Sequence, residues 1–256
     1  MNGDHLIELK HLQKSFGPQK VLRDVNLEIR RGETMVIIGT SGGGKSVILK
    51  HCIGLLQPDG GEVVVDGKVI SSNSHIDVKT IRKRMGMLFQ GAALFDSMNV
   101  GENIKFAVRE HEKQHSEADL DRIVAETLHM INLNPDFRFK MPSELSGGMK
   151  KRLGLARAIA LKPEILLYDE PTTGLDPITS DVINDLIIDM QAKLGATNIV
   201  VTHDMVSAYK IADRIAMLLD GRIIFVGTPE ETRATSNPYV QQFILGQRKL
   251  GGAEAE

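Results

Sequence analysis

The sequence predicts an α/β protein whose core is a parallel β-sheet flanked by helices. An apolar run at 35–38 leads into the glycine-rich segment 39–46, behind which apolar residues continue as a helix. Further along, an apolar run at 165–168, a helical pattern over 182–194 and a β-branched segment at 198–202 repeat the order strand, helix, strand. Alternation of this kind, with continuous rather than alternating apolar strands, is typical of a buried parallel sheet.

The composition is that of an ordinary globular protein. The chain has 256 residues, of which 42% are hydrophobic, and no apolar run approaches the roughly 18 to 20 residues that span a bilayer. The start, 1–5, lacks the basic and apolar regions of a secretion signal, and the single cysteine, Cys52, excludes an intrachain disulfide. A net charge of −2 supplies no basic field for nucleic-acid phosphates. We therefore expect a cytosolic protein without a nucleic-acid partner, for which a partner would supply any membrane span.

The first 70 residues predict partly antiparallel structure. Val25, Leu27 and Ile29 alternate with polar residues as in a half-buried strand, and 62–70 reads as a hairpin that turns at Asp66-Gly67.

Helical spacing dominates from about 91 to 160, which indicates an inserted helical subdomain. The apolar residues that carry the pattern are Leu120, Ile123, Val124, Leu128 and Ile131.

After the parallel core, a second hairpin is predicted at Asp220-Gly221, and the tail at 251–256 is expected to be disordered. A short apolar stripe precedes that tail. Because it follows the last apparent core strand, we expect it to pack on a partner or a second subunit, with packing on its own domain as the alternative. The stripe consists of Tyr239, Val240, Phe243 and Ile244.

The glycine-rich segment has the composition of a phosphate-binding loop. Its glycines let backbone N–H groups approach phosphate oxygens, and the helix behind it adds a positive N-terminal dipole. Lys45 would reach the β and γ phosphates of a nucleotide, and the Ser46 hydroxyl would bind Mg²⁺. The candidate binding residues are Gly39, Thr40, Ser41, Gly42, Gly43, Gly44, Lys45 and Ser46.

Two acidic residues follow the apolar run at 165–168. Asp169 is expected at the C-terminal end of a buried strand, where a Mg²⁺ ligand belongs. Glu170 can then face the γ-phosphate and orient or deprotonate an attacking water, a role that contributes about 10² to 10⁴ in rate.

A further glycine-containing segment lies about 100 residues after the first, at Leu145 to Met149. Ser146 can cap a helix, while Gly147 and Gly148 expose backbone donors at its positive end, which predicts a second anion site. Taken alone, the segment also fits a flexible loop with a cap. The order and spacing of the three segments favour ATP binding and hydrolysis.

With these motifs in this order, the chain resembles the nucleotide-binding subunits of ATP-binding cassette (ABC) transporters from about residue 6 to 230. The glycine-rich loop matches their Walker A motif, Asp169-Glu170 their Walker B motif, and 145–149 their signature. Without the resemblance, an aromatic side chain, a loop glutamine and a strand-end histidine would be structural. The residues that the resemblance adds are the adenine-stacking Phe16, Val47 in the Walker A segment, the Q-loop Gln90, the D-loop Asp176 and the switch histidine His203.

The resemblance implies a P-loop NTPase fold with a RecA-like parallel core, an N-terminal antiparallel subdomain and an inserted helical subdomain. It implies a nucleotide-binding domain at 1–235, a C-terminal tail at 236–256, and ATP and Mg²⁺ as cofactors, with Gln90 joining the metal ligands and sharing catalysis with Glu170 and His203. Two ATP molecules would be sandwiched in a dimer in which the signature of one subunit completes the site of the other. An integral membrane permease would place the chain at the inner face of the cell membrane.

Within the family, the sequence around the motifs resembles the Mla or MCE-type phospholipid-transport ATPases. Met149 stands where glutamine is usual, and the segments 89–98, 145–157 and 167–177 carry the similarity. We therefore expect phospholipid transport, with lipid-transport accessory subunits, and an importer of another small solute as the alternative. The permease is expected on the surface formed by Leu94, Phe95 and Met98, for which internal packing is the alternative.

Two other classes of function fit less well. A soluble ABC ATPase of DNA or translation usually carries paired cassettes, a coiled-coil insertion or basic arms, and a P-loop kinase would leave the signature without a role. Two remaining features are interpreted as structural: Cys52 as buried packing, and the basic triplet 150–152 as the solvated face of a helix.

Overall fold

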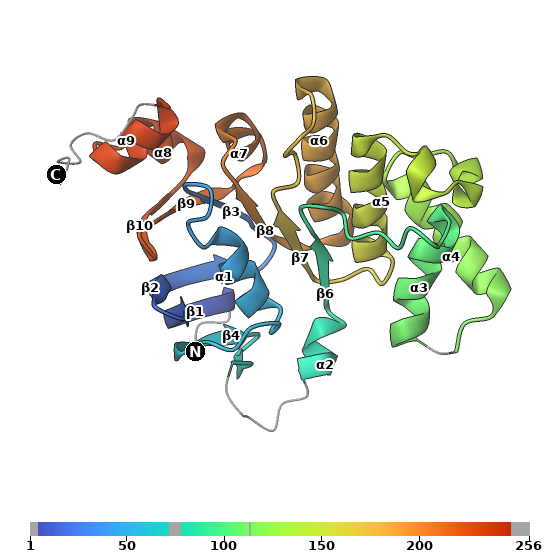
Figure 1. Cartoon of the computed structure of the whole chain (residues 1–256), viewed down its shortest axis with the longest axis horizontal. Helices are drawn as coiled ribbons and strands as arrows, with labels where there is room; N and C mark the ends of the chain where they lie inside the picture. Colours follow the sequence, from blue (N-terminus) through green and yellow to red (C-terminus); the bar gives the residue numbers. More distant parts are fainter. Residues whose placement is uncertain (1–4, 72–77, 113, 247–256) are drawn as a thin grey trace.

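The computed structural model describes residues 5–71, 78–112 and 114–246. Their strands form one ten-stranded sheet in the order β5-β4-β1-β2-β10-β9-β3-β8-β7-β6. Figure 1 shows the antiparallel strands near the N-terminus on one side, the parallel strands in the middle and a group of helices on the far side. Within these described ranges, no helix combines the length and apolar content needed to cross a membrane.

The antiparallel part is built from β1 (His5–Phe16), β2 (Gln19–Arg30), β4 (Gly60–Val65) and β5 (Lys68–Val69). β1 lies between β2 and β4 and pairs antiparallel with both. The predicted hairpin turns at Asp66-Gly67, where both residues have positive φ angles of 50° and 72°. The three alternating apolar residues of β2 are all buried, as their spacing predicts.

The parallel part is completely buried along its central strands, which explains their continuous apolar sequence. β10 (Arg222–Gly227) turns back from β9 at Asp220-Gly221, as predicted, and joins the parallel part to β2. The strands of this part are β3 (Thr34–Ile38), β6 (Met85–Leu88), β7 (Ile165–Asp169), β8 (Thr197–Thr202) and β9 (Arg214–Leu219).

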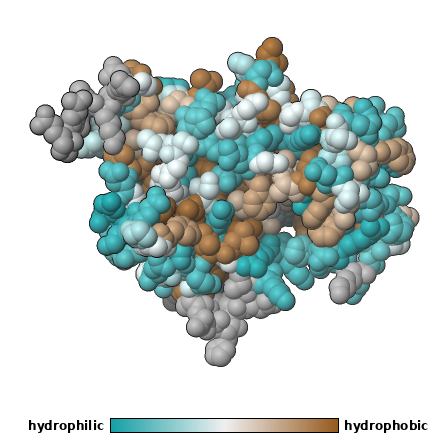
Figure 2. All heavy atoms as spheres, in the orientation of Figure 1, coloured by the Kyte–Doolittle hydropathy of each residue, from teal (hydrophilic) through white to brown (hydrophobic). Residues whose placement is uncertain are grey.

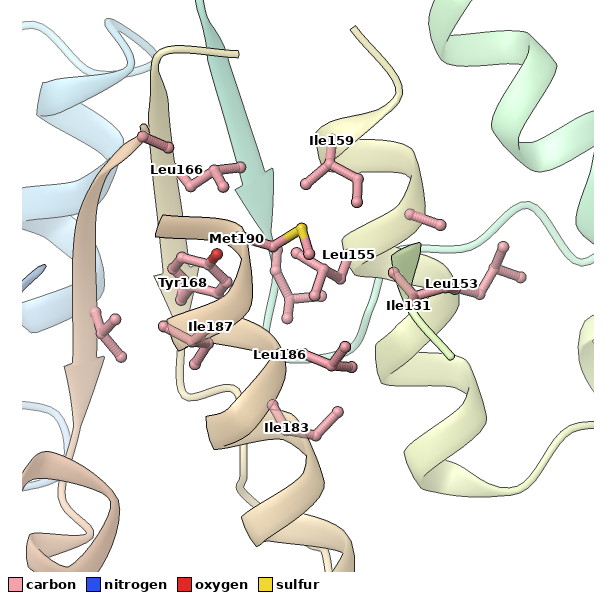
Figure 3. Close-up of a cluster of buried hydrophobic side chains, with 14 of the residues drawn as sticks. Ile131, Leu153, Leu155, Ile159, Leu166, Tyr168, Ile183, Leu186, Ile187 and Met190 are labelled. Carbon is pink, nitrogen blue, oxygen red and sulfur yellow. The ribbon is translucent and has the colours of Figure 1, made fainter. Parts of the chain in front are cut away.

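Two apolar clusters cover the two faces of this sheet. Alternate residues of β7 enter different clusters: Leu166 and Tyr168 enter one, and their neighbours enter the other. Figure 3 shows these two side chains against those of the two long helices that cover their face. The helices beside the parallel strands are α1 (Lys45–Cys52) on one face and α5 (Gly147–Ile159), α6 (Pro177–Leu194) and α7 (Met205–Ile211) on the other.

The predicted helical insertion lies between β6 and β7. It contains α3 (Val100–His111), α4 (Glu117–Met130), two short 3₁₀ turns at Pro135–Phe139 and Pro142–Glu144, and then α5. A short helix α2 (Val78–Arg82), absent from the sequence analysis, precedes β6. The periodic apolar residues of α4 face the core as expected, with Leu120, Val124 and Leu128 buried within the helix and Ile131 buried at its end.

The described C-terminal part forms α8 (Pro229–Ala234) and α9 (Pro238–Ile244). The expectation that the apolar stripe of α9 packs on a partner is wrong for most of its side chains. Val240 is completely buried, and Phe243 and Ile244 pack against the core cluster of their own chain, whereas Tyr239 is 58% exposed. The spacing of the apolar residues identified which face of α9 is apolar, but it could not show whether the chain's own domain or a partner covers that face. The expected disorder at 251–256 lies outside the described residues.

Candidate functional site

The glycine-rich loop connects β3 to α1 at the C-terminal edge of the parallel sheet. Gly44 precedes the helix with φ 101°, and a Cβ on it would lie 2.9 Å from Val21 Cγ1. Gly42 also has a positive φ, of 75°. Side chains at these positions would strain the backbone, so glycine is needed to bring the loop over the start of α1. The first N–H groups of α1 and its positive dipole end therefore face the site.

Lys45 is the first residue of α1, and its side chain is 5% exposed. Its ammonium donates to the backbone oxygens of Gly39 and Thr40, at 2.9 and 3.0 Å, and lies 3.4 Å from Glu170 Oε1. A buried ammonium needs such oxygen acceptors. Phosphate oxygens are acceptors of the same kind, so the geometry suits the predicted role.

Ser46 and Asp169 meet although they are 123 positions apart in the sequence. The Ser46 hydroxyl donates to Asp169 Oδ1 at 2.6 Å, which joins the start of α1 to the end of β7. Neighbouring ligands of an octahedral Mg²⁺ lie about 3 Å apart, given metal–oxygen bonds of about 2.1 Å. The hydroxyl and carboxylate oxygens have the chemistry that Mg²⁺ prefers, and they need to separate by only a few tenths of an ångström to reach that spacing.

Glu170 follows β7 and is 8% exposed. Its φ of 48° lies in the left-handed region, which is uncommon for a residue with a side chain. Its N–H donates to Val201 O at 3.0 Å, and Oε2 accepts a hydrogen bond from Thr173 Oγ1 at 3.0 Å. The carboxylate is thus held in one orientation, with Oε1 toward Lys45.

His203 lies immediately after β8 and is half exposed. Its Nδ1 is 2.8 Å from Glu170 Oε2, so that oxygen contacts both His203 and Thr173. The next residue, Asp204, caps α7 through its side chain, and this fixes the chain direction after the histidine. The predicted switch histidine and the predicted base are therefore in direct contact.

A cavity of about 400 Å³ brings most of the predicted nucleotide-binding residues together. Phe16 lies at its edge with 47% of its surface exposed, in keeping with a stacking platform rather than a core residue. Gln90 is exposed and also lines the cavity. The predicted residues that line it are Phe16, Ser41, Gly42, Gly44, Lys45, Ser46, Val47, Gln90, Glu170 and His203.

The signature segment and Asp176 do not line this cavity, and both lie next to Thr179 at the start of α6. Ser146 caps α5, and Asp176 caps α6 by accepting hydrogen bonds from the backbone N–H and the hydroxyl of Thr179. These bonds hold the pKa of Asp176 below its usual range. A Cβ on Gly148 would lie 2.3 Å from the Thr179 methyl group. The glycine thus allows the starts of α5 and α6 to touch.

The interpretation of 150–152 as a solvated face is wrong for Lys151. This side chain is 6% exposed, and its ammonium donates to Gln90 O at 2.5 Å and to Glu170 O at 3.0 Å. Burial lowers the pKa of Lys151, and the nearby carboxylates of Asp169 and Glu170 oppose that shift. α5 packs against β6, so its inner face includes this position.

Two residues near Glu170 were missed by the sequence analysis. Thr173 donates to the Glu170 carboxylate, and Lys151 donates to its backbone oxygen. Thr173 lies three positions after Glu170, where a hydroxyl can turn back to the carboxylate, so its spacing carried a usable signal. Lys151 carried none, because its contacts depend on how α5 packs.

Comparison with known proteins agrees with this geometry. Residues 22–173 match the model of the family described as ABC transporter. The "Intermembrane phospholipid transport system ATP-binding protein MlaF" of Haemophilus influenzae is 41% identical over 95% of this chain and 91% of its own length. The "Probable ribonucleotide transport ATP-binding protein mkl" of Mycobacterium leprae is 43% identical over 94% of this chain and 69% of its own length.

Solved structures show the same fold. The dimeric post-hydrolysis state of the ATP-binding cassette MJ0796, bound to ADP and phosphate, has a TM-score of 0.79 and 32% sequence identity. The match covers 87% of this chain and 98% of that one.

The fold and the site define a nucleotide-binding subunit that hydrolyses ATP. The chain belongs to the ABC transporter family. The expected family, fold class and ATPase activity are confirmed by these matches.

Proposed function

We propose that this chain is the ATPase subunit of a transporter that moves phospholipid between membranes, attached to the inner face of the cell membrane through an integral permease. The observation that carries this proposal is the 41% identity to a relative named for intermembrane phospholipid transport, across 91% of that relative. ATP hydrolysis at this site drives transport, and the partner subunits recognise the cargo.

The proposed ATP site uses the cavity described above. Phe16 stacks on adenine, the backbone N–H groups of 39–47 bind the phosphates, and Lys45 exchanges its carbonyl and carboxylate acceptors for phosphate oxygens. Ser46, Asp169 and Gln90 hold Mg²⁺, which offsets phosphate charge when it is bound. The contact between the Ser46 hydroxyl and Asp169 supports this ligand set.

Glu170 is the proposed general base for the attacking water. Its carboxylate is nearly buried, and Thr173 and His203 both contact Oε2, which leaves Oε1 oriented toward the cation of Lys45. A carboxylate that is already oriented lowers the entropic cost of reaching the reactive geometry. His203, half exposed at the edge of the same cavity, is placed to contact the γ-phosphate.

A second copy of the chain completes each site in this proposal. The cavity that holds the Walker residues is not lined by Ser146, Gly147, Gly148 or Asp176, and Gly148 and Asp176 both lie next to Thr179. We assign them to the ATP bound by the other subunit. ATP that binds the closed dimer better than the open one shifts the population toward closure, and hydrolysis reverses the shift.

The permease is proposed to dock beside the helical insertion. A hollow of about 250 Å³ lies between α1, β6, α3 and α5, and it is lined by Ile53, Leu55, Met87 and Phe89 among others. Figure 2 shows apolar side chains beside a hollow on this face. Of the residues expected at the contact, Leu94 packs partly inward, and Phe95 packs edge-on against Phe106. The hollow is therefore the better candidate surface.

A small solute is the second candidate cargo, and one observation favours it. The mycobacterial relative with 43% identity carries a name for ribonucleotide transport. Since both relatives match nearly the whole chain, the cassette itself does not separate the two cargoes.

Purification of the chain with its partners from native membranes distinguishes phospholipid from a small solute as the cargo. The tagged chain, solubilised in mild detergent, is expected to bring down a membrane permease together with bound phospholipid detected by mass spectrometry. Recovery of a permease with a solute-binding protein, and with no more lipid than an unrelated membrane complex, would contradict phospholipid transport. The Leu55→Asp variant should lose the permease while keeping ATP affinity, and the exposed Leu245→Asp serves as its matched control.

A further inference from the structure

The ammonium of Lys151 joins three elements that carry the motifs of this chain. It belongs to the signature helix α5 and donates to Gln90 O, after β6, and to Glu170 O, after β7. We propose that Lys151 is a positioning residue that fixes the backbones of Gln90 and Glu170 to the signature helix, so that the ATP site of one subunit and the signature offered to the other subunit change together. The proposal rests on the catalytic roles proposed above for Gln90 and Glu170.

The burial of Lys151 separates it from an ordinary helix-surface lysine. Its side chain is 6% exposed, whereas Lys162, just beyond the same helix, has 69% of its side chain exposed. A buried ammonium is costly unless acceptors and opposite charge surround it. Two carbonyl oxygens accept hydrogen bonds from its ammonium, and Asp169 and Glu170 place negative charge nearby. The site is therefore built for a cation at this position.

The backbone of Glu170 is where such a link matters most. With φ at 48°, this residue occupies an unfavourable left-handed conformation that persists only when its surroundings fix it. Its N–H is held by Val201 O, and its carbonyl oxygen is held by Lys151 Nζ and by Thr173 N at 3.3 Å. Lys151 is the only one of these three partners that lies on the helical insertion.

The link to Gln90 connects the same cation to the loop that leaves the sheet for the helical insertion. Because its carbonyl oxygen is 2.5 Å from Lys151 Nζ, a displacement of α5 must either move this loop or break the bond. A lysine offers three donors from one atom, which an uncharged aliphatic side chain of similar length cannot do. Methionine at this position would keep much of the packing and remove the link.

The expected consequence is a loss of turnover without a loss of ATP binding. Lys151 donates to the two backbones and does not line the nucleotide cavity. Removing it leaves the phosphate-binding loop intact and frees the orientation of Glu170 and Gln90. We expect kcat for ATP hydrolysis to fall about tenfold or more, with KM changed less than about twofold, since a hydrogen bond from a charged donor is lost at each loop.

The experiment compares Lys151→Met, Lys151→Arg and the matched control Lys162→Met in the full chain. Steady-state ATPase assays give kcat and KM, a fluorescent ATP analogue gives affinity, and hydrogen exchange reports on 89–91 and 170–173. Lys151→Met is expected to lower kcat and speed exchange at both segments. Lys151→Arg keeps charge and donors and is expected to restore most of kcat, and Lys162→Met should match the wild type.

Several results would overturn the proposal. These are an unchanged kcat in Lys151→Met, or a lower kcat with unchanged exchange at both segments, or an equal loss in Lys162→Met. If the methionine variant does not fold, Lys151→Leu, which also lacks a donor, is judged by the same criteria. Glu170→Gln is assayed in parallel, and full activity in that variant would reject the catalytic assignment of Glu170. Hydrogen exchange at 170–173 in Lys151→Met tests separately whether Lys151 holds the backbone.

Discussion

Replacement of Glu170 by glutamine isolates the charge of the proposed base. The amide has almost the same shape, and its carbonyl oxygen can still accept the hydrogen bond that Thr173 donates at 3.0 Å. The carboxylate lies 3.4 Å from Lys45 Nζ, where it competes with phosphate oxygens for the same cation. Removing its charge is therefore expected to leave ATP affinity unchanged or to raise it.

The size of the kinetic effect follows from the lost proton acceptor. General base catalysis contributes about 10² to 10⁴ in rate, and each tenfold corresponds to about 1.36 kcal/mol. Glu170→Gln should therefore raise the barrier to hydrolysis by about 2.7 to 5.4 kcal/mol. Its side chain is 11% exposed and held by Thr173, so the amide of the variant is expected to stay where the carboxylate stood.

The assay pairs steady-state phosphate release with nucleotide affinity and with size-exclusion chromatography in ATP. The variant is expected to lose turnover, keep ATP and accumulate as closed dimer. Glu230→Gln, the same change at an exposed position on α8, is the matched control and should behave as wild type. Turnover within about threefold of wild type in Glu170→Gln would refute the assignment, because it would place the base elsewhere.

Three further predictions test other parts of the chain. Ser146→Arg should stop hydrolysis but leave the ATP affinity of the isolated subunit intact, and lost affinity there would contradict an intersubunit signature. Gly148→Ala should lower the free energy of unfolding in denaturant by about 1 to 3 kcal/mol through its contact with the Thr179 methyl. Gly147→Ala, with 3.5 Å to its nearest neighbour, should cost less, and Thr179→Ser should rescue Gly148→Ala. Burial raises the pKa of Cys52 to about 12, so at pH 8 about one thiol in 10⁴ is ionised and a thiol reagent should label the native chain far more slowly than the unfolded one. Equal labelling rates would contradict that burial.

Much of the candidate site could be predicted because its residues are determined by local sequence. A glycine-rich loop between a buried strand and a helix has few possible conformations, and an acidic pair after an apolar run is placed at the strand end. Ser46 and Asp169, expected to share a metal, indeed meet at 2.6 Å. The parallel strand order itself brings their two segments to one edge of the sheet.

Burial of single polar residues could not be predicted in the same way. Lys151 lies in a basic triplet, and its burial depends on contacts with residues 61 and 19 positions away. The apolar stripe of α9 likewise showed which face is apolar without showing that its own domain covers it. Helical spacing constrains the direction of a side chain, but the surface opposite that side chain is set by the tertiary fold.

The contact between Gly148 and Thr179 has a mechanical consequence. Asp176 holds Thr179 by two hydrogen bonds, and the Thr179 methyl occupies the space that a Cβ on Gly148 would need. The signature end of α5 and the first turn of α6 therefore form one packed block, in which a displacement of either helix is passed to the other. If this block faces the nucleotide of the second subunit, a tilt of α5 also moves Asp176. If ATP in the second subunit favours one position of the block, that position of the block must strengthen ATP binding there by the same free energy.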